Sequence, residues 1–404
     1  MSGSLPDGSA LAEQIASARW YGGKGATIVD VSEEDRLELA EGVALHVLRV
    51  EAEARPAERY LYLTGEERLA APVLESIVEA SDRGDWSFEP GVVLPGLMPS
   101  QLTQRPIGLD QSNTTLVVGE RLALKLYRRL EPGPHPDIEI GRYLTEQASV
   151  AFVPAYAGCV RWRGHAVAML QAYVSDAADG WTWAAQAVQD GDVSDISRLG
   201  ANTATLHAAL AQMEARTATA EQLAGWRRSA DAQLRRALEL VDGEAGSELR
   251  DYAPRLREEF AALELGAPPT LTRVHGDYHV GQILRSVDGL RVVDFEGEPT
   301  KGLDERSALG TPLRDVAAML RSFDHLARHV DRDILTGEGP RVEHWIMDAR
   351  EAFLGSYGDH DPRLLRALEA EKETYEFIYA ATFLPEWMYA PVAGMRWLMG
   401  TRAQ

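Results

Sequence analysis

Three polar side chains between Val274 and Pro299 have the types and spacing that phosphoryl transfer requires. Asp277 precedes Gln282 by five residues, and Asp294 follows after a turn at Asp288-Gly289 and a short apolar run. A carboxylate can orient and deprotonate a hydroxyl, and an amide with a second carboxylate can hold Mg²⁺ against nucleotide phosphates. The stretch therefore predicts Asp277 as the catalytic carboxylate and Gln282 and Asp294 as metal ligands.

These side chains come in the order that protein-kinase loops use, which is H-R-D-x-x-x-x-N followed by D-F-G. Here the letters read H-G-D-x-x-x-x-Q and D-F-E. Gln is a longer amide than Asn with the same carbonyl ligand, so the change moves the oxygen without altering its type. Glu296 stands where protein kinases have glycine, and Glu298 follows it. Either acid could serve the metal or the acceptor, and the alternative is a solvated acidic turn; we assign Glu296 to the substrate.

A strand and a helix upstream must position the nucleotide phosphates. Lys125 interrupts the apolar run LALKLY with a charge that is costly to bury unpaired. We expect its partner to be Glu139 in HPDIEIGRYL, a helix that Pro136 opens. Such a pair positions the α and β phosphates in kinases. The segment GLDQSNTT lacks G-x-G-x-x-G but occupies the place of a phosphate-covering loop, which makes Ser112 and Asn113 further candidates.

The motifs HGDYHVGQIL and VVDFEGEP resemble those of the aminoglycoside-phosphotransferase-like kinases. Within that family they are most similar to the motifs of actinobacterial maltokinases and maltokinase-like glucosamine kinases. ARWYGGKG, PLRDVAAMLRSFD and EKETYEFIY extend the resemblance along nearly the whole chain. It implies an α+β, bilobal protein-kinase-like fold. An N-terminal α/β cap domain would span residues 1–98, a strand-rich lobe with one helix residues 99–174, and a mostly helical lobe residues 175–404. ATP and Mg²⁺ are the implied cofactors.

The resemblance also assigns roles to residues that carry no signal of their own. Backbone groups near Gln171 and Tyr173 would read the adenine edge, and the acid at Asp315 would support the catalytic loop through its backbone N–H groups. Glu376 and Trp387 near the C-terminus fit sugar binding, since proteins hold sugars by aromatic stacking and carboxylate hydrogen bonds. The alternative for both is a C-terminal helix that packs its aromatic residues.

Elsewhere the pattern predicts structural roles. The chain from Trp181 to about Leu263 is expected to be helical, and His207 is expected to be a satisfied helix histidine. Two further helices near the C-terminus should break at Pro385 and Pro391. Lys24 in ARWYGGKG suits a helix end better than a ligand site, because short motifs carry little weight.

Composition limits the partners. The formal charge of −21, from 62 acids against 41 bases, disfavours nucleic acid and anionic lipid surfaces. The single cysteine, Cys159, excludes an intrachain disulfide. No window of the sequence reaches about 18 apolar residues, and the first residues lack the features of a signal peptide. We expect a cytoplasmic protein, monomeric or weakly self-associating, whose partner is a small-molecule sugar.

The identity of the sugar divides the candidates. YAATFLPEW places apolar groups where maltokinases have polar ones, so we favour glucosamine, phosphorylated to glucosamine 6-phosphate, over maltose, phosphorylated to maltose 1-phosphate. An aminoglycoside phosphotransferase is a third possibility. A non-catalytic sugar- or nucleotide-binding module on a kinase fold is a fourth, against which the intact set of catalytic residues argues.

Overall fold

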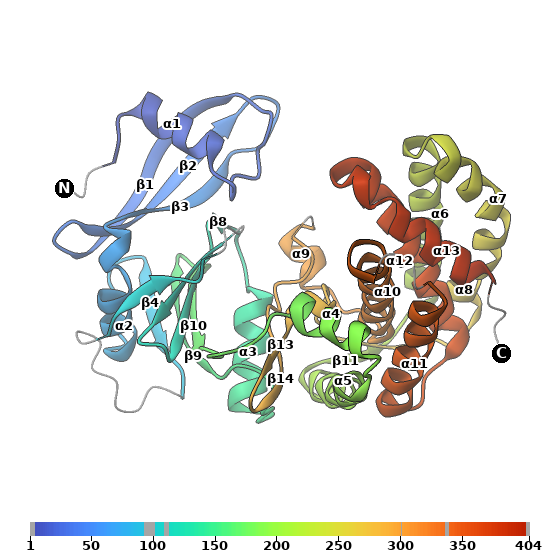
Figure 1. Cartoon of the computed structure of the whole chain (residues 1–404). Helices are drawn as coiled ribbons and strands as arrows, with labels where there is room; N and C mark the ends of the chain where they lie inside the picture. The colour runs from blue at the N-terminus through green and yellow to red at the C-terminus, as the bar shows by residue number, and fades with distance from the viewer. Residues whose placement is uncertain (1–4, 93–101, 109–112, 300, 336–338, 401–404) are drawn as a thin grey trace. The chain divides into compact units, whose positions relative to one another are not determined.

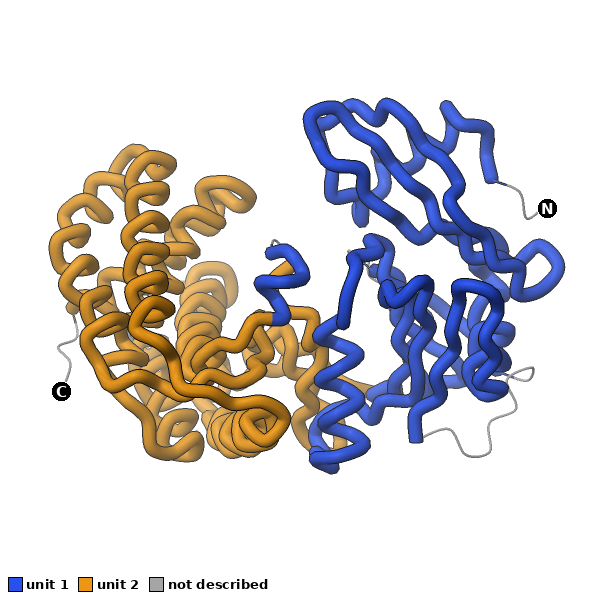
Figure 2. The backbone as a smooth tube through the Cα atoms, turned by 180° about the vertical axis from the view of Figure 1, so that it is seen from behind, with its two compact units in different colours: residues 1–175, 301–307 blue, residues 176–300, 308–404 orange. Residues whose placement is uncertain are grey.

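The computed structural model describes residues 5–92, 102–108, 113–299, 301–335 and 339–400. Two compact units share the chain (Figure 2). Unit 1 comprises Met1–Ser175 and Lys301–Ser307, and unit 2 comprises Asp176–Thr300 and Ala308–Gln404. The predicted three-domain division, with boundaries after residues 98 and 174, stays a prediction.

The first sheet of unit 1 is four-stranded and antiparallel, in the order β1-β2-β3-β8. Its strands are β1 (Ile28–Ala40), β2 (Val43–Ala52), β3 (Glu58–Thr64) and β8 (Arg129–Leu130), and helix α1 (Gly8–Ser17) packs against this sheet. Leu11 and Ile15 of α1 pack with Leu48, Val50 and Tyr60 of the sheet. Strand β2 is buried along most of its length, whereas β1 is largely polar and mostly exposed or half-buried.

The second sheet of unit 1 is six-stranded and antiparallel, in the order β4-β9-β10-β7-β6-β5. It comprises β4 (Trp86–Pro90), β5 (Gln104–Pro106), β6 (Thr114–Val118), β7 (Leu122–Leu126), β9 (Tyr156–Trp162) and β10 (His165–Ala172). The helices of this part are α2 (Ala70–Val78) and α3 (Pro136–Glu146), and the short α9 (Leu303–Arg306) completes unit 1. Register places Lys125 of β7 between Thr115 of β6 and Met169 of β10.

Both sheets contribute to one hydrophobic core. Leu45 and Leu61 of the first sheet belong to the same buried cluster as Leu124 and Leu170 of the second. A polar contact also joins the sheets, because the carboxylate of Asp35 on β1 accepts hydrogen bonds from the indole N–H groups of Trp86 and Trp162, at 3.1 and 2.6 Å. Unit 1 is therefore held together across its two sheets by shared packing.

Unit 2 is mostly helical (Figure 1). Its helices are α4 (Gly180–Asp190), α5 (Ser194–Met213), α6 (Ala220–Leu240), α7 (Gly243–Glu259), α8 (Ala262–Leu265), α10 (Leu313–Val330), α11 (Gly339–Tyr357), α12 (Pro362–Phe383) and α13 (Tyr389–Gly400). Helix α10 contacts α4, α11, α12 and α13. The strands form two small antiparallel pairs, β11 (Ala215–Thr217) with β12 (Thr270–Thr272) and β13 (Ile283–Ser286) with β14 (Gly289–Val292).

The helices expected between Trp181 and Leu263 are present, interrupted by β11. One expectation near the C-terminus is wrong. Pro385 does follow the end of α12 and opens the short helix η5 (Pro385–Trp387), but Pro391 lies inside the first turn of α13 and breaks nothing. Proline suits a first helical turn, because the N–H it lacks has no partner there in any case.

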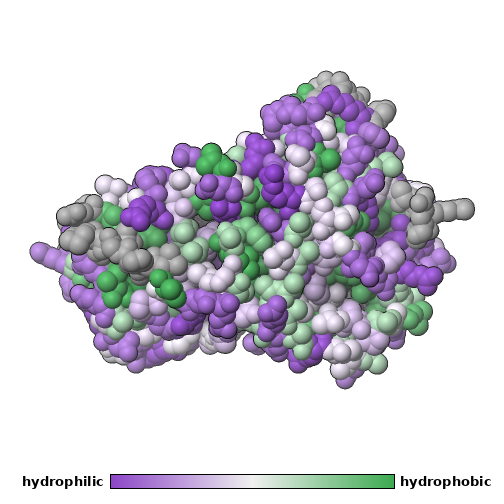
Figure 3. Space-filling model, turned by 90° about the horizontal axis from the view of Figure 1, so that it is seen from below, coloured by the Kyte–Doolittle hydropathy of each residue, from purple (hydrophilic) through white to green (hydrophobic). Residues whose placement is uncertain are grey.

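Hydrophilic side chains are spread over the face of the molecule that Figure 3 displays, with hydrophobic residues in groups between them. Within the described residues, no helix combines the length and apolar character needed to span a membrane. The expected cytoplasmic location and the monomeric or weakly associated state stay predictions.

Candidate active site

A buried acid fixes the loop that carries Asp277. The carboxylate of Asp315, at the start of α10, accepts hydrogen bonds from the backbone N–H groups of His275 and Gly276, at 2.8 and 3.0 Å. Gly276 has a φ of +83°, a left-handed conformation that suits glycine. The expected support of the catalytic loop by Asp315 is thus confirmed.

The environment of Asp315 favours its charged form. Burial raises its pKa, but the hydrogen bond and charge of His207 and the N–H of Gly276 act against burial and keep the pKa below its ordinary value of 3.8. His207 lies 3.2 Å from Asp315 and 3.1 Å from the hydroxyl of Tyr357. The prediction that His207 is a satisfied helix histidine is confirmed.

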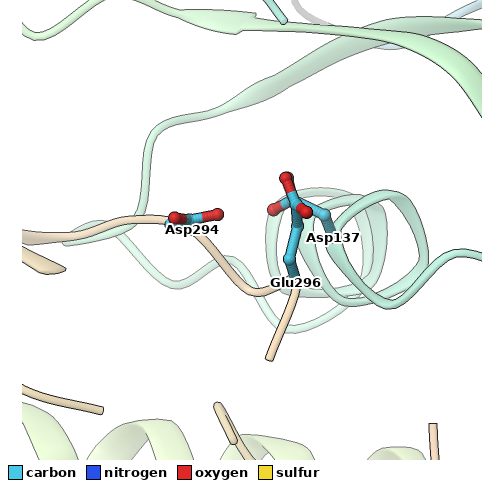
Figure 4. Close-up of side chains that lie close together, drawn as sticks. All are labelled: Asp137, Asp294 and Glu296. Carbon is cyan, nitrogen blue, oxygen red and sulfur yellow. The ribbon is translucent and has the colours of Figure 1, made fainter. Parts of the chain in front are cut away.

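The two predicted metal ligands lie side by side. Gln282 ends the short helix η3 (Val280–Gln282), Asp294 follows β14, and Gln282 Nε2 lies 3.4 Å from Asp294 Oδ2. Asp294 has a φ of +69°, a conformation that non-glycine residues rarely adopt and that is common at functional sites. Glu296, which Figure 4 shows on the same segment, brings a carboxylate oxygen within 4.8 Å of one from Asp294.

This donor set fits Mg²⁺. The ion prefers oxygen ligands and keeps several of its sites for water and phosphate oxygens, so one or two carboxylates suffice from the protein. The segment after β14 supplies Asp294 and Glu296, and a rotation of the Gln282 amide presents its carbonyl oxygen. The metal roles of Gln282 and Asp294 nevertheless stay predictions.

A cavity of about 530 Å³ opens beside Asp277 within unit 2. Three predicted site residues, Asp277, Glu376 and Trp387, line it. Glu298 also lines the cavity. The carboxylate of Glu296 lies close to that of Asp294. The loop that carries Asp277, together with α10, α12 and η5, supplies most of the wall, through residues that include His279, Arg321, His325, Lys372, Tyr375 and Tyr379. Trp181 of α4 and Leu384, between α12 and η5, also line the cavity.

The α12 side of the cavity carries paired charges. Lys372 Nζ lies 2.9 Å from the carboxylate of Glu376 and 4.8 Å from the ring centroid of Tyr375. The hydroxyl of Tyr375 donates a hydrogen bond to Glu298. Burial lowers the pKa of Lys372, but the charges of Glu376, Glu298 and Asp277 raise it above its ordinary value of 10.5, so the ammonium stays charged.

Buried charged side chains contact one another behind the part of the cavity wall that α10 forms. His325 lines the cavity and bonds the carboxylate of Glu373 at 2.9 Å, and Arg321 contacts Glu373 at 3.5 Å and Glu369 at 3.0 Å. Glu369 and Glu373 are fully buried, and Arg321 nearly so. Asp324 lies 4.0 Å from Arg321. Because charges this deep are costly unless they are paired, the network fixes α10 against α12 with little freedom.

Aromatic rings line the rest of the cavity. Trp387 stacks on His329 with ring centroids 4.7 Å apart and meets Trp181 edge-on at 6.0 Å. On α12, the ring centroids of Tyr379 and Tyr375 lie 6.4 Å apart. Such faces suit the C–H surface of a sugar ring, and the neighbouring carboxylates suit its hydroxyl groups.

In unit 1, Lys125 is paired as expected of a phosphate-positioning lysine, but the acid at 2.8 Å is Asp137. The hydroxyl of Tyr127 donates to the same carboxylate at 3.0 Å. The side chains of Lys125 and Asp137 are 12% and 2% exposed, so the contact is largely screened from water. A pairing of Lys125 with Glu139 stays a prediction.

The other nucleotide candidates also belong to unit 1, apart from Ser112, which lies outside the described residues. Asn113 accepts a hydrogen bond from the backbone N–H of Arg128 at 3.4 Å. Gln171 pairs with Ala123 near the end of β10. Tyr173 donates its backbone N–H to the carbonyl of Arg121 at 2.8 Å. Their contacts with a nucleotide stay predictions.

Lys24 has a structural role. Its ammonium donates to the carbonyl oxygens of Ala16, Ser17 and Ala18 at the end of α1. Cations near a helix C-terminus satisfy carbonyl groups that have no partner within the helix. The expectation of a helix end is confirmed.

Comparison with known proteins assigns the chain to a family. The pattern of the phosphotransferase enzyme family, APH, matches residues 103–368. The chain belongs to this phosphotransferase family. The matched span includes Lys125, Asp277, Gln282 and Asp294, the residues expected to carry the transfer chemistry.

Curated relatives of this phosphotransferase include two glucosamine kinases. The enzyme of Streptacidiphilus jiangxiensis is 33% identical over 313 residues, which cover 71% of this chain and 72% of the relative. The enzyme of Mycolicibacterium smegmatis is 31% identical over 393 residues, covering 90% and 97%. A solved glucosamine kinase in complex with glucosamine, ADP and inorganic phosphate is 28% identical, with a TM-score of 0.78 and coverage of 96% and 99%. The predicted α+β, protein-kinase-like fold is confirmed.

Sequence reasoning did not select three residues of these sites, Asp137, His325 and Lys372. Each had a weak signal of its own or comes from an element distant in sequence from Asp277. Lys372 and Glu376 stand four apart on a helix, the spacing at which side chains meet. That spacing could have identified Lys372.

Proposed function

We propose that this phosphotransferase is an ATP- and Mg²⁺-dependent sugar kinase that transfers the γ-phosphate to a hydroxyl of glucosamine, forming glucosamine 6-phosphate. The observation that carries the proposal is the cavity in which Asp277 shares a wall with two further acids and several aromatic rings. An ammonium sugar needs carboxylates for its charge, and its ring needs an aromatic face. The glucosamine kinases among its relatives support the same conclusion.

In this mechanism Asp277 accepts the hydrogen bond of the attacking hydroxyl and aims it at phosphorus. Asp315 keeps the backbone of the catalytic loop in place through His275 and Gly276. Gln282 and Asp294 would hold Mg²⁺, which supplies neutralisation of phosphate charge when it is bound. Lys125, held by Asp137, positions the nucleotide phosphates.

Purified protein incubated with ATP-Mg²⁺ and each of glucosamine, maltose, glucose and an aminoglycoside, with ADP release measured, tests the proposal. Glucosamine should support turnover, and Asp277→Asn should reduce it by about 10³-fold or more while the protein stays folded. Asp359→Asn, at an exposed acid of unit 2, is the matched control and should leave the rate unchanged. Turnover confined to maltose or glucose would overturn the choice of sugar. Glucosamine binding without any turnover would favour the binding-module alternative.

A further inference from the structure

The tautomer of His279 is fixed by its place in the loop that carries Asp277. His279 directly precedes the short helix η3, and its Nδ1 accepts a hydrogen bond from the backbone N–H of Gly281 at 3.0 Å. A backbone N–H can only donate, so Nδ1 must present a lone pair, and the ring proton lies on Nε2. On its other side, His279 therefore presents an N–H donor.

The backbone around His279 leaves its ring little freedom. The N–H of Val280 donates to the hydroxyl of Ser322 on α10 at 3.0 Å, and the N–H of Gln282 donates to the carbonyl of His279 at 2.9 Å. The ring lies so close to Gly281 that a Cβ at that position would come within 2.9 Å of Nδ1 and 2.7 Å of Cε1. Glycine is needed there for space, and the ring packs against it.

The Nε2 donor of His279 lies beside the carboxylate of Asp277. Nε2 is 3.8 Å from Asp277 Oδ2, and both residues line the cavity. This separation is too long for a hydrogen bond, since N–H···O bonds span about 2.7–3.2 Å. A single oxygen can, however, lie at about 2.8 Å from both atoms and bond each of them. The side chains of His279 and Asp277 are 38% and 26% exposed, so a ligand in the cavity can reach them.

A hydroxyl group matches this combination of one donor and one acceptor. It can give its hydrogen to Asp277 Oδ2 and accept the Nε2–H of His279 on one lone pair, which leaves its second lone pair for phosphorus. A carboxylate alone fixes the direction of the O–H bond but lets the oxygen rotate about it. The N–H of His279 would stop that rotation and stabilise the negative charge that develops on the oxygen as its proton leaves.

Two other nitrogen donors of the cavity wall are already bonded to acids. Lys372 contacts Glu376 at 2.9 Å, and His325 bonds Glu373 at 2.9 Å. Either group would have to leave its acid to reach an attacking hydroxyl. Nε2 of His279 makes no hydrogen bond within the part of the chain that the structure describes, so it can donate to a ligand without breaking an existing bond.

We propose that His279 is a second catalytic residue, whose Nε2–H donates a hydrogen bond to the acceptor oxygen that attacks phosphorus. This inference rests on the proposed function, in which that oxygen is the 6-hydroxyl of glucosamine. In the transfer, the bond from this oxygen to the γ-phosphorus forms and the bond from phosphorus to the bridging oxygen breaks, so that ADP leaves with the electron pair. The hydroxyl proton passes to Asp277, and His279 keeps its own proton throughout.

Amide variants separate the loop contact of His279 from this chemistry. The side chain of His279→Asn can accept from the N–H of Gly281 in place of Nδ1, but it has no donor at the place of Nε2. His279→Gln reaches the place of Nε2 with an amide N–H₂. His344→Asn, at an exposed histidine of α11, is the matched control. Should His279→Asn fail to fold, Gly281→Ala gives the same test, because its Cβ would displace the ring.

The binding of two sugars measures the proposed contact. The probes are glucosamine and 6-deoxyglucosamine, which lacks the attacking oxygen, and isothermal titration calorimetry gives the ratio of their dissociation constants. The wild type should prefer glucosamine, and His279→Asn should reduce this preference by about three-fold or more, as expected for the loss of one hydrogen bond. His279→Gln should retain more of the preference, and His344→Asn should retain all of it. A change that merely disturbed the loop would weaken binding of both sugars alike.

Turnover provides a second readout. With glucosamine as the acceptor, His279→Asn should lower kcat by about ten-fold or more, while the melting temperature and the KM for ATP stay unchanged. An unchanged sugar preference in His279→Asn would overturn the inference even if kcat fell, because His279 would then act on the phosphate or the loop and not on the hydroxyl.

The outcomes for the wild type separate this inference from the proposed function. A preference for glucosamine that His279→Asn reduces, without phosphate transfer to glucosamine by the wild type, would contradict the proposed function alone. Phosphate transfer to glucosamine with equal binding of the two sugars would overturn the inference alone. Binding of neither sugar would contradict both.

Discussion

The carboxylate of Asp315 accepts a hydrogen bond from the backbone N–H of Gly276 at 3.0 Å, one residue before Asp277. Asp315→Asn keeps the shape of the side chain but replaces one carboxylate oxygen by an amide N–H₂, which cannot accept a hydrogen bond from the backbone N–H of His275 or Gly276. Leaving a buried donor unpaired costs about 1–3 kcal/mol. We expect the free energy of unfolding to fall by about that amount and kcat to fall about ten-fold or more, measured by urea denaturation and ADP release. An unchanged kcat would show that the loop holds its geometry without Asp315.

The effect of Asp315→Asn on the free energy of unfolding should depend on pH. The pKa of Asp315 in the folded protein lies below that in the unfolded chain, so its ionisation stabilises the fold above about pH 4. As the pH falls through the lowered native pKa, that contribution is lost. The difference in unfolding free energy between the wild type and Asp315→Asn should therefore be constant near neutral pH and shrink in acid. A difference that grows in acid would contradict this assignment.

Lys125 and Asp137 should act as a pair in nucleotide use. Lys125→Met removes the cation that we propose positions the phosphates, and Asp137→Asn releases the lysine from its 2.8 Å contact. Each change should lower kcat/KM for ATP by about ten-fold or more, and the double variant should lose less than the two single losses combined. Lys24→Met, at the lysine that caps α1, is the control and should leave kcat/KM for ATP unchanged. Fully additive losses would mean that the two residues act independently.

Asp35 should stabilise unit 1 without affecting chemistry. Asp35→Ala leaves the indole N–H groups of Trp86 and Trp162 without their acceptor, and both indoles are buried. We expect a loss of about 1–3 kcal/mol of unfolding free energy for each indole, followed by tryptophan fluorescence during denaturation. Glu38→Gln, on the same strand with a side chain 57% exposed, should change stability little. Equal stabilities of the two variants would argue against this role.

His325 should make stability depend on pH near neutrality. Burial lowers its pKa, but the charge and hydrogen bond of Glu373 and the charge of Glu376 raise the pKa above 6.5. A raised histidine pKa stabilises the fold below the unfolded value and loses that contribution as the pH rises through the folded value. His325→Gln should therefore be most destabilising below about pH 6.5 and approach the wild type at alkaline pH. Denaturation curves across this range measure the trend, and a gap that widens with rising pH would refute it.

How much the sequence could predict depended on how local each feature was. Gln282 and Asp294 were identifiable because one short hairpin fixes both. The contact of Lys125 with Asp137 was not. Asp137 lies on α3, and whether its side chain reaches Lys125 depends on the rotation of the whole helix, which no local pattern fixes.

The cavity beside Asp277 shows the same limit over longer distances. Glu376 and Trp387 could be proposed from an acid and an aromatic near the C-terminus. His325 and Lys372 become neighbours of Asp277 only when α10 and α12 pack together. No spacing along the chain records that packing. The sequence left Glu296 and Glu298 both open as acids of the metal or the acceptor. Glu298 lines the cavity and Glu296 lies close to Asp294, and the direction of each side chain depends on the backbone after β14, where Asp294 has a positive φ.

The core that the two sheets of unit 1 share has a consequence for dissection of the chain. Its apolar residues come from β1–β3 and from β6, β7, β9 and β10 alike, and β8 closes the edge of β3 with residues that follow β7. Cleavage of the chain near residue 98 would expose apolar surface on both fragments. Neither fragment should be recovered as a folded protein that stays in solution without aggregating. Limited proteolysis should degrade unit 1 in a single step, without first removing its N-terminal segment.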